Sequence, residues 1–60
     1  MFIKLTGSEG SYYININQIT YFEKADSKEI HTSIALNYMG YIYVKETPEE
    51  ILKLIEECEK

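Results

Sequence analysis

The sequence predicts a small α+β fold, with an antiparallel β-sheet or meander of four to five strands and one C-terminal α-helix packed on one face. Over most of the chain, apolar residues recur at every second position, which is the period of half-buried strands. From residue 48 onward the period changes to 3.6, which is that of an amphipathic helix. Sixty residues are enough for one domain, which we expect to span residues 1–60.

Five segments have the pattern of strands. They lie at about residues 2–6, 11–17, 19–24, 29–36 and 41–45. Polar stretches separate them, and the first and last of these stretches contain glycine, which favours tight turns. The third segment is ambiguous, because Ile19 and Tyr21 would share one face while Phe22 would lie on the other, so that both faces look partly covered.

The helix is expected from about residue 48 to residue 59. Thr47 suits the N-cap, Pro48 the first helical position, and Glu50 the third position of a capping box. We interpret Glu46 and Glu49, like Glu50, as helix-capping groups and not as ligands of a divalent ion. The apolar stripe of the helix consists of Ile51, Leu54, Ile55 and Cys58.

The strand pattern also predicts which side chains lie under the helix. We expect these to be Ile3, Leu5, Ile14, Ile16, Ile30, Ile34, Leu36, Ile42 and Val44. Tyr41 and Tyr43 then point away from it, and the chain has six tyrosines in all. Tyrosine combines a large contact area with a hydroxyl that can stay solvated, so it is common in interfaces. The residues predicted to form such an interface are Tyr13, Tyr21, Phe22, Tyr38, Tyr41 and Tyr43. Cross-strand aromatic pairing that only stabilises the sheet is the alternative.

Composition and size exclude several functions. Ten acidic residues, six lysines and no arginine give a net charge of −4, which argues against duplex nucleic acid as a partner. No apolar stretch near the N-terminus resembles a signal peptide or a membrane span, and a single cysteine fits the cytoplasm, where we expect the chain to reside. A domain this small has a marginal core, so we expect it to form a homo-oligomer or to bind a protein partner.

No residue pattern predicts catalysis, a cofactor or a metal site, and we expect no enzyme. Glu29, His31 and Ser33 would stand in a row along a strand, roughly 7 Å apart per step, which is too far for a nucleophile to bond its base. Cys58 lies on the apolar stripe, where cysteine acts as a small hydrophobe. Gly7 and Gly10 lack the following helix and lysine of a phosphate-binding loop.

Several residues match the pattern of a known family. They are Ile3, Leu5, Thr6, Gly10, Asn15, Ile19, Glu23, Gly40, Val44, Lys45, Glu46, Thr47, Glu50 and Ile51. Through them nearly the whole chain resembles the FlbD family of small bacterial flagellar proteins. The chain departs from that family where Asn37-Tyr38-Met39-Gly40 replaces a compact Asn-Gly turn. From Ile19 onward it is also similar to the strand-to-helix unit of LytTR-type DNA-binding domains, without their basic residues. Similar short chains occur in phages and other mobile elements, often as proteins that block or sequester a host component.

The sequence therefore predicts a non-catalytic, oligomeric protein-interaction module, resembling FlbD-type small proteins of bacteria or phages. The alternative is a ligand-binding or sequestering protein, in which tyrosines at a subunit interface stack on a nucleotide-like ligand.

Overall fold

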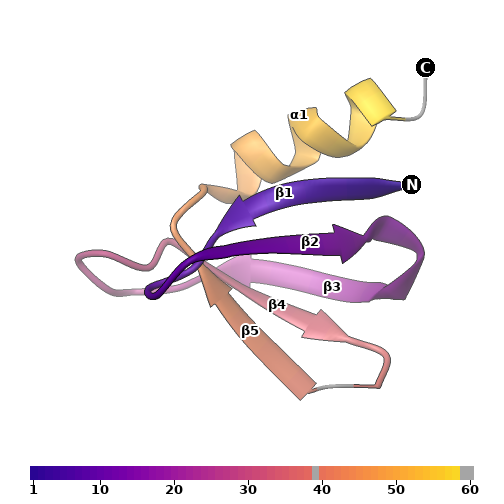
Figure 1. The fold of residues 1–60 in the computed structure, drawn as a ribbon. Coiled ribbons are helices and arrows are strands. Elements are labelled where there is room, and N and C mark those ends of the chain that lie inside the picture. Colours follow the sequence, from indigo (N-terminus) through magenta and orange to yellow (C-terminus); the bar gives the residue numbers. More distant parts are fainter. Residues whose placement is uncertain (39, 59–60) are drawn as a thin grey trace.

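The computed structural model describes residues 1–38 and 40–58 and confirms the α+β fold. Its elements are the strands β1 (Phe2–Thr6), β2 (Ser11–Asn15), β3 (Ile19–Lys24), β4 (Thr32–Leu36) and β5 (Gly40–Val44), the 3₁₀ helix η1 (Ile16–Gln18) and the helix α1 (Pro48–Cys58). The strands form two antiparallel sheets, β1-β2 and β3-β4-β5, and α1 contacts β1 and β3 (Figure 1). Within the described residues, no helix is long and apolar enough to span a membrane.

The β1–β2 hairpin closes through a tight turn at residues 7–10. The Gly7 N–H donates to the Gly10 carbonyl at 2.7 Å. A Cβ atom on Gly7 would lie 2.5 Å from Cε2 of Tyr12, so the close approach of the Tyr12 ring requires glycine there. The pairing of Ile3 with Ile14 and of Leu5 with Tyr12 turns these four side chains to the inner face of the hairpin.

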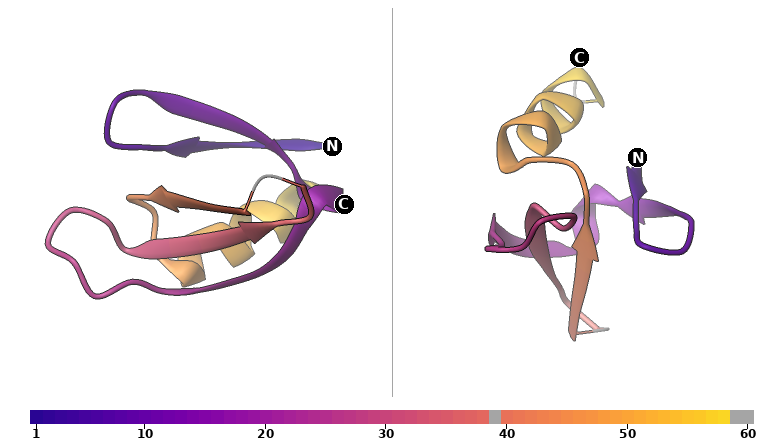
Figure 2. Two further views of the ribbon diagram at one scale, coloured as in Figure 1. Left: turned by 90° about the horizontal axis from the view of Figure 1, so that it is seen from below. Right: turned by 90° about the vertical axis from the view of Figure 1, so that its left-hand side faces the viewer.

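Strand β2 is shorter than the predicted strand at 11–17, which is wrong in its last two residues. The Asn15 side chain accepts a hydrogen bond from the Asn17 N–H at 3.0 Å and caps η1, so the backbone turns at Ile16. This single 3₁₀ turn carries the chain from one sheet to the other. Figure 2 shows the hairpin on one side of the molecule and the three-stranded sheet on the other.

Strand β4 begins at Thr32, so the predicted start at residue 29 is also wrong. The Ala25 N–H donates to the His31 carbonyl at 3.0 Å, which closes the β3–β4 connection and leaves the residues between them outside the ladder. Ile30, expected in the core, is therefore only half-buried and lies outside the core cluster.

A β-bulge in β3 resolves the ambiguity of its facing. Ile19 pairs with Leu36 and Tyr21 pairs with Ala35, so two steps along β3 match one step along β4. Thr20 is the extra residue. Beyond the bulge the alternation is reversed, so Tyr21 points to the outer face while Phe22, opposite Ile34, joins Ile19 on the inner face.

The core lies between the inner faces of the two sheets and α1. Its buried residues are Ile3, Leu5, Ile34, Leu36, Ile42, Val44 and Ile51. Ile14 and Ile16, which were expected with them, are only partly buried and pack against this cluster, as do Leu54, Ile55 and Cys58 of the helix. Ile51 is fully buried while its neighbour Leu52 is 51% exposed, as the 3.6-residue period predicts.

Helix α1 begins where the sequence predicts. The Glu50 carboxylate accepts the Thr47 N–H at 3.0 Å, and the Thr47 hydroxyl accepts the Glu50 N–H at 3.2 Å, which is a reciprocal capping box. The Thr47 N–H, and the Thr47 hydroxyl at 3.1 Å, both donate to the Glu50 carboxylate and lower its pKa, because they favour its charged form. The predicted last residue of the helix, Glu59, lies outside the described residues, as does Met39 of the predicted turn.

Candidate functional site: two tyrosine-bearing surfaces

The outer face of the three-stranded sheet carries Tyr21, Tyr41 and Tyr43, and we call these residues the tyrosine face. The strand register places all three there: Tyr21 and Tyr41 pair with Ala35 of the central strand, and Tyr43 pairs with Ser33. Small residues thus run down the middle of this face between larger ones. The sequence prediction that Tyr41 and Tyr43 point away from the core is confirmed, since Ile42 and Val44 between them are buried.

Tyr21 and Tyr41 are joined directly across the central strand. Their hydroxyls are 2.7 Å apart, and their rings meet edge to face with centroids 6.3 Å apart and planes at 73°. The pair covers Ala35, which is only 7% exposed. The hydrogen bond to Tyr41 raises the pKa of Tyr21, and partial desolvation and electrostatic interactions with Tyr41 and Glu23 act in the same direction.

The tyrosine face is open to solvent in the described part of the chain. Tyr21 is 46% exposed, and Tyr41 and Tyr43 are each 54% exposed. Glu23 pairs with Ser33 and so lies on this face too. It is the one charged residue among the strand residues there, since the others, besides the tyrosines, are Ser33 and Ala35. The acidic residues of α1 lie on a different part of the molecule (Figure 1).

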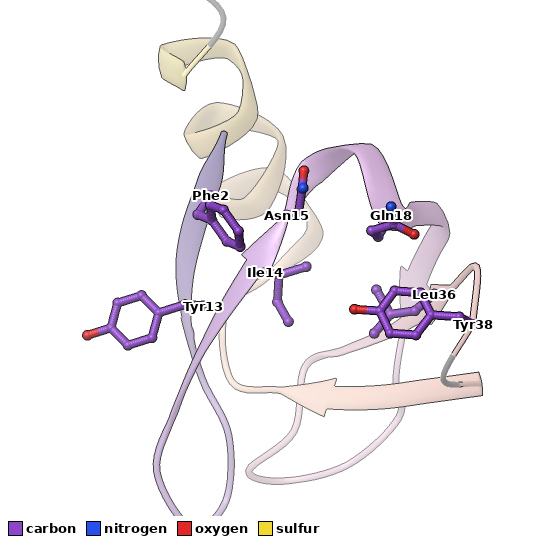
Figure 3. A pocket seen from close by; sticks show the side chains of 7 residues that line it. All are labelled: Phe2, Tyr13, Ile14, Asn15, Gln18, Leu36 and Tyr38. Carbon is purple, nitrogen blue, oxygen red and sulfur yellow. The ribbon is translucent and has the colours of Figure 1, made fainter.

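Tyr13 and Tyr38 belong to a second surface, a shallow groove between β2 and the end of β4. The groove has a volume of about 370 Å³ and is lined by Phe2, Tyr13, Ile14, Asn15, Gln18, Leu36 and Tyr38. Figure 3 shows Tyr13 and Ile14 leaving β2 on opposite sides, with Ile14 facing Tyr38 across the gap. The amides of Asn15 and Gln18 lie at one end of the groove, next to η1.

The six predicted interface residues therefore do not form one patch. Three are on the tyrosine face and two are at the groove, while Phe22 packs half-buried against the core. The prediction omitted Phe2, which lines the groove and is 62% exposed. The sequence did contain a signal for Phe2. Side chains alternate along β1, so Phe2 lies on the face opposite to the buried Ile3 and Leu5.

The carboxylate of Glu46 has a structural partner far away in the sequence. Its Oε1 accepts the Thr6 backbone N–H at 2.8 Å and its Oε2 accepts the Thr6 hydroxyl at 2.9 Å. The backbone carbonyl of Glu46 also accepts the Thr32 hydroxyl at 2.6 Å. The interpretation of Glu46 as a helix cap is therefore wrong: it ties β1 to the segment between β5 and α1.

His31 and Cys58, two other side chains considered for chemistry, are also engaged in the fold. Nδ1 of His31 donates to the Lys45 carbonyl at 2.9 Å, and the Cys58 thiol donates to the Phe2 carbonyl at 3.6 Å. In the regions 1–38 and 40–58, His, Cys, Asp and Glu side chains do not gather into a group that could hold a metal ion.

We compared the chain with protein-family models, with curated proteins and with solved structures, and none of them matches it. The geometry of the two surfaces is therefore the basis for a functional proposal.

Proposed function

We propose that the chain is a non-catalytic protein-interaction module, that it is oligomeric, and that the tyrosine face is a contact surface. The observation that carries the proposal is the exposure of three tyrosines, each about half open to solvent, on a sheet face with a single charged residue in register. Aromatic residues are enriched and charged residues depleted in the cores of protein interfaces.

The arrangement of Tyr21 and Tyr41 supports this proposal. A side chain that is ordered before binding loses less conformational entropy when a partner docks, and this increases affinity. The hydroxyl-to-hydroxyl bond and the edge-to-face contact hold both rings over Ala35. Tyr21 and Tyr41 therefore offer a preformed aromatic surface, with Tyr43 beside it on β5.

The proposal also covers where the protein acts and what kind of partner it binds. The residues shared with the FlbD family support a small cytoplasmic protein of a bacterium or phage, whose partner would be another protein. The net charge of −4 and the absence of arginine support the same choice over duplex nucleic acid.

Affinity purification from cells of the source organism tests the tyrosine face. The bait is the tagged wild-type chain, compared with the double variant Tyr41→Ser and Tyr43→Ser and with Leu52→Ser as a control on the exposed side of the helix. We expect the wild type and Leu52→Ser to retain the same protein and the double variant to lose it. Equal retention by all three baits, together with a wild type that light scattering shows to be strictly monomeric, would refute the proposal.

The groove supports the second candidate function, binding of a small aromatic ligand such as a nucleotide. Its volume falls in the range of small-molecule sites, and it combines aromatic walls with two amide side chains. A ligand that binds only the folded state raises the melting temperature. A nucleotide that stabilises the wild type but not Tyr38→Ala would favour this candidate, and the absence of any shift across a nucleotide panel would exclude it.

A further inference from the structure

Strand β2 has an edge whose backbone groups are unpaired. Two backbone bonds show which β1–β2 pairs are hydrogen-bonded. The Gly7 N–H donates to the Gly10 carbonyl, and the Ile16 N–H donates to the Met1 carbonyl at 3.0 Å. Because hydrogen-bonded and non-hydrogen-bonded pairs alternate, Tyr12 and Ile14 bond to β1. The N–H and C=O groups of Ser11 and Tyr13 and the N–H of Asn15 point outward, and no backbone bond reaches them from the described parts of the chain. The Asn15 C=O, at the N-cap of η1, accepts the first bond of that helix.

This edge lacks the features that protect β3 and the outer side of β1. Strand β3 has its bulge at Thr20 and the charged residues Glu23 and Lys24. The outer side of β1 is occupied, since Lys45 and Glu46 bond to Thr6. Strand β2, with the sequence Ser-Tyr-Tyr-Ile-Asn, has no charge, proline or bulge. Such an edge is a template for pairing with another strand, and Figure 2 shows β2 as the outermost strand on its side.

We propose that β2 pairs antiparallel with β2 of a second copy of this chain, on a two-fold axis at Tyr13. The inference deepens the proposed function, because it names the surface through which the oligomer forms. In this register Tyr13 lies opposite Tyr13 of the partner subunit, and Ser11 lies opposite Asn15 of the partner subunit. Both outward groups of Tyr13, the Asn15 N–H and the Ser11 C=O then find partners, whereas any other two-fold register leaves some of these without one.

The side chains in this register are compatible with self-association. No charged residue lies within β2, so two copies can pair without opposing like charges although each carries −4. On the inner face, the exposed Tyr12 lies next to the half-buried Ile14 of the partner subunit. On the outer face, the two Tyr13 side chains meet.

The exposed aromatic area around β2 is close to the lower limit for a specific interface. Phe2, Tyr12, Tyr13 and Tyr38 lie on or next to β2 and are between 40% and 70% exposed. Their exposed parts amount to on the order of 500 Å² per copy, given about 200 Å² for an aromatic side chain. Two copies together reach about 1,000 Å², which is the lower limit for a specific interface.

A charge at the centre of the pairing tests the proposal. Tyr13→Lys would place two ammonium groups opposite each other, so we expect the wild type to be dimeric and this variant monomeric by sedimentation equilibrium. Tyr43→Lys makes the same charge change on the tyrosine face and should remain dimeric. Far-ultraviolet circular dichroism checks that both variants are folded. If the β2 inference alone fails, Tyr13→Lys remains as oligomeric as the wild type while the tyrosine-face variants still lose their partner.

Cysteine cross-linking tests the register and does not depend on charge. In a Cys58→Ser background, Tyr13→Cys places two cysteines at a hydrogen-bonded pair with Cα atoms about 5.5 Å apart, which a disulfide can span. Ser11→Cys places them roughly 14 Å apart, which is too far. We expect mild oxidation to link the first variant and not the second. A wild-type monomer at all concentrations, equal linking of both variants, or an edge that binds only an unrelated extended peptide would overturn the inference.

Discussion

Glu46 holds Thr6 with both oxygens of its carboxylate, one on the backbone N–H at 2.8 Å and one on the hydroxyl at 2.9 Å. The two residues are 40 positions apart in the sequence. Next to them, the Lys45 N–H donates to the Thr6 carbonyl at 2.8 Å. The end of β1 is therefore fastened to the link between β5 and α1, which joins the two-stranded sheet to the rest of the molecule.

Replacing Glu46 by alanine should destabilise the fold by about 1–3 kcal/mol. The substitution leaves the partly buried N–H and hydroxyl of Thr6 without their acceptor. Urea unfolding measures the change in the free energy of unfolding. Glu49→Ala is the control, because Glu49 is exposed and the change should be within roughly 0.5 kcal/mol. Equal effects of the two substitutions would show that the Thr6 contact contributes nothing.

Ile51→Ala should be far more damaging than Leu52→Ala on the same helix. Ile51 is fully buried in the core cluster, so truncation removes apolar contacts and leaves a cavity, at a cost of about 2–5 kcal/mol. The total stability of a 60-residue domain is about 3–9 kcal/mol, so this loss is a large part of it. Thermal unfolding should show a partly unfolded Ile51→Ala protein at room temperature. Leu52 is 51% exposed, and its variant should melt close to the wild type.

Glu50 should make the fold sensitive to acid. Its pKa is lowered in the folded protein by the bonds from Thr47, so its stabilising contribution is present above the pKa of the unfolded chain and is lost as pH falls through the folded value. The loss should occur below about pH 4.3. Glu50→Gln can still form a capping box but does not titrate. Urea unfolding at a series of acidic pH values should show a shallower decline for this variant, and an unchanged slope would contradict the assignment.

Tyr21 should ionise at higher pH than an ordinary tyrosine, whose pKa is about 10. The hydrogen bond to Tyr41 stabilises the protonated form of Tyr21 and raises its pKa. The stabilisation that this bond gives the fold is therefore fully present below the pKa of Tyr21 in the unfolded chain, and it is lost as the pH rises through the pKa of Tyr21 in the folded protein. Ultraviolet titration of tyrosinate detects the step. Tyr41→Phe should move it to lower pH, whereas Tyr43→Phe removes a hydroxyl that takes no part in this bond. Identical effects of the two variants would argue against the pairing.

Local signals predicted the parts of the fold that depend on neighbours in the sequence. The start of α1 depends on residues within four positions of one another. Thr47 and Glu50 bond to each other, and Pro48 suits the first helical position, so the sequence alone located this start. The facing of Tyr41 and Tyr43 depends only on the alternation within β5. The same alternation predicted two of the three residues of the tyrosine face correctly.

Other features depend on partners that no local pattern reveals. The bulge at Thr20 reverses the facing of Phe22, and nothing in the sequence of β3 indicates that two of its residues oppose one of β4. The capping side chain of Asn15 ends β2 although Ile16 continues the apolar alternation, and this separates the two sheets. The bond between Glu46 and Thr6 spans most of the chain, so the helix-cap interpretation was the nearest local explanation.

The fastening of β1 has a consequence for the synthesis of the protein. Thr6 bonds to Lys45 and Glu46, and the core residues Ile3 and Leu5 pack in one cluster with Ile51. Strand β1 is therefore synthesised before the residues that hold it in place, and these contacts can form only once Glu46 and Ile51 have been made. Until then part of the apolar face of the hairpin lacks the neighbours that bury it in the folded protein, so a chaperone that binds nascent chains can act on it in that interval.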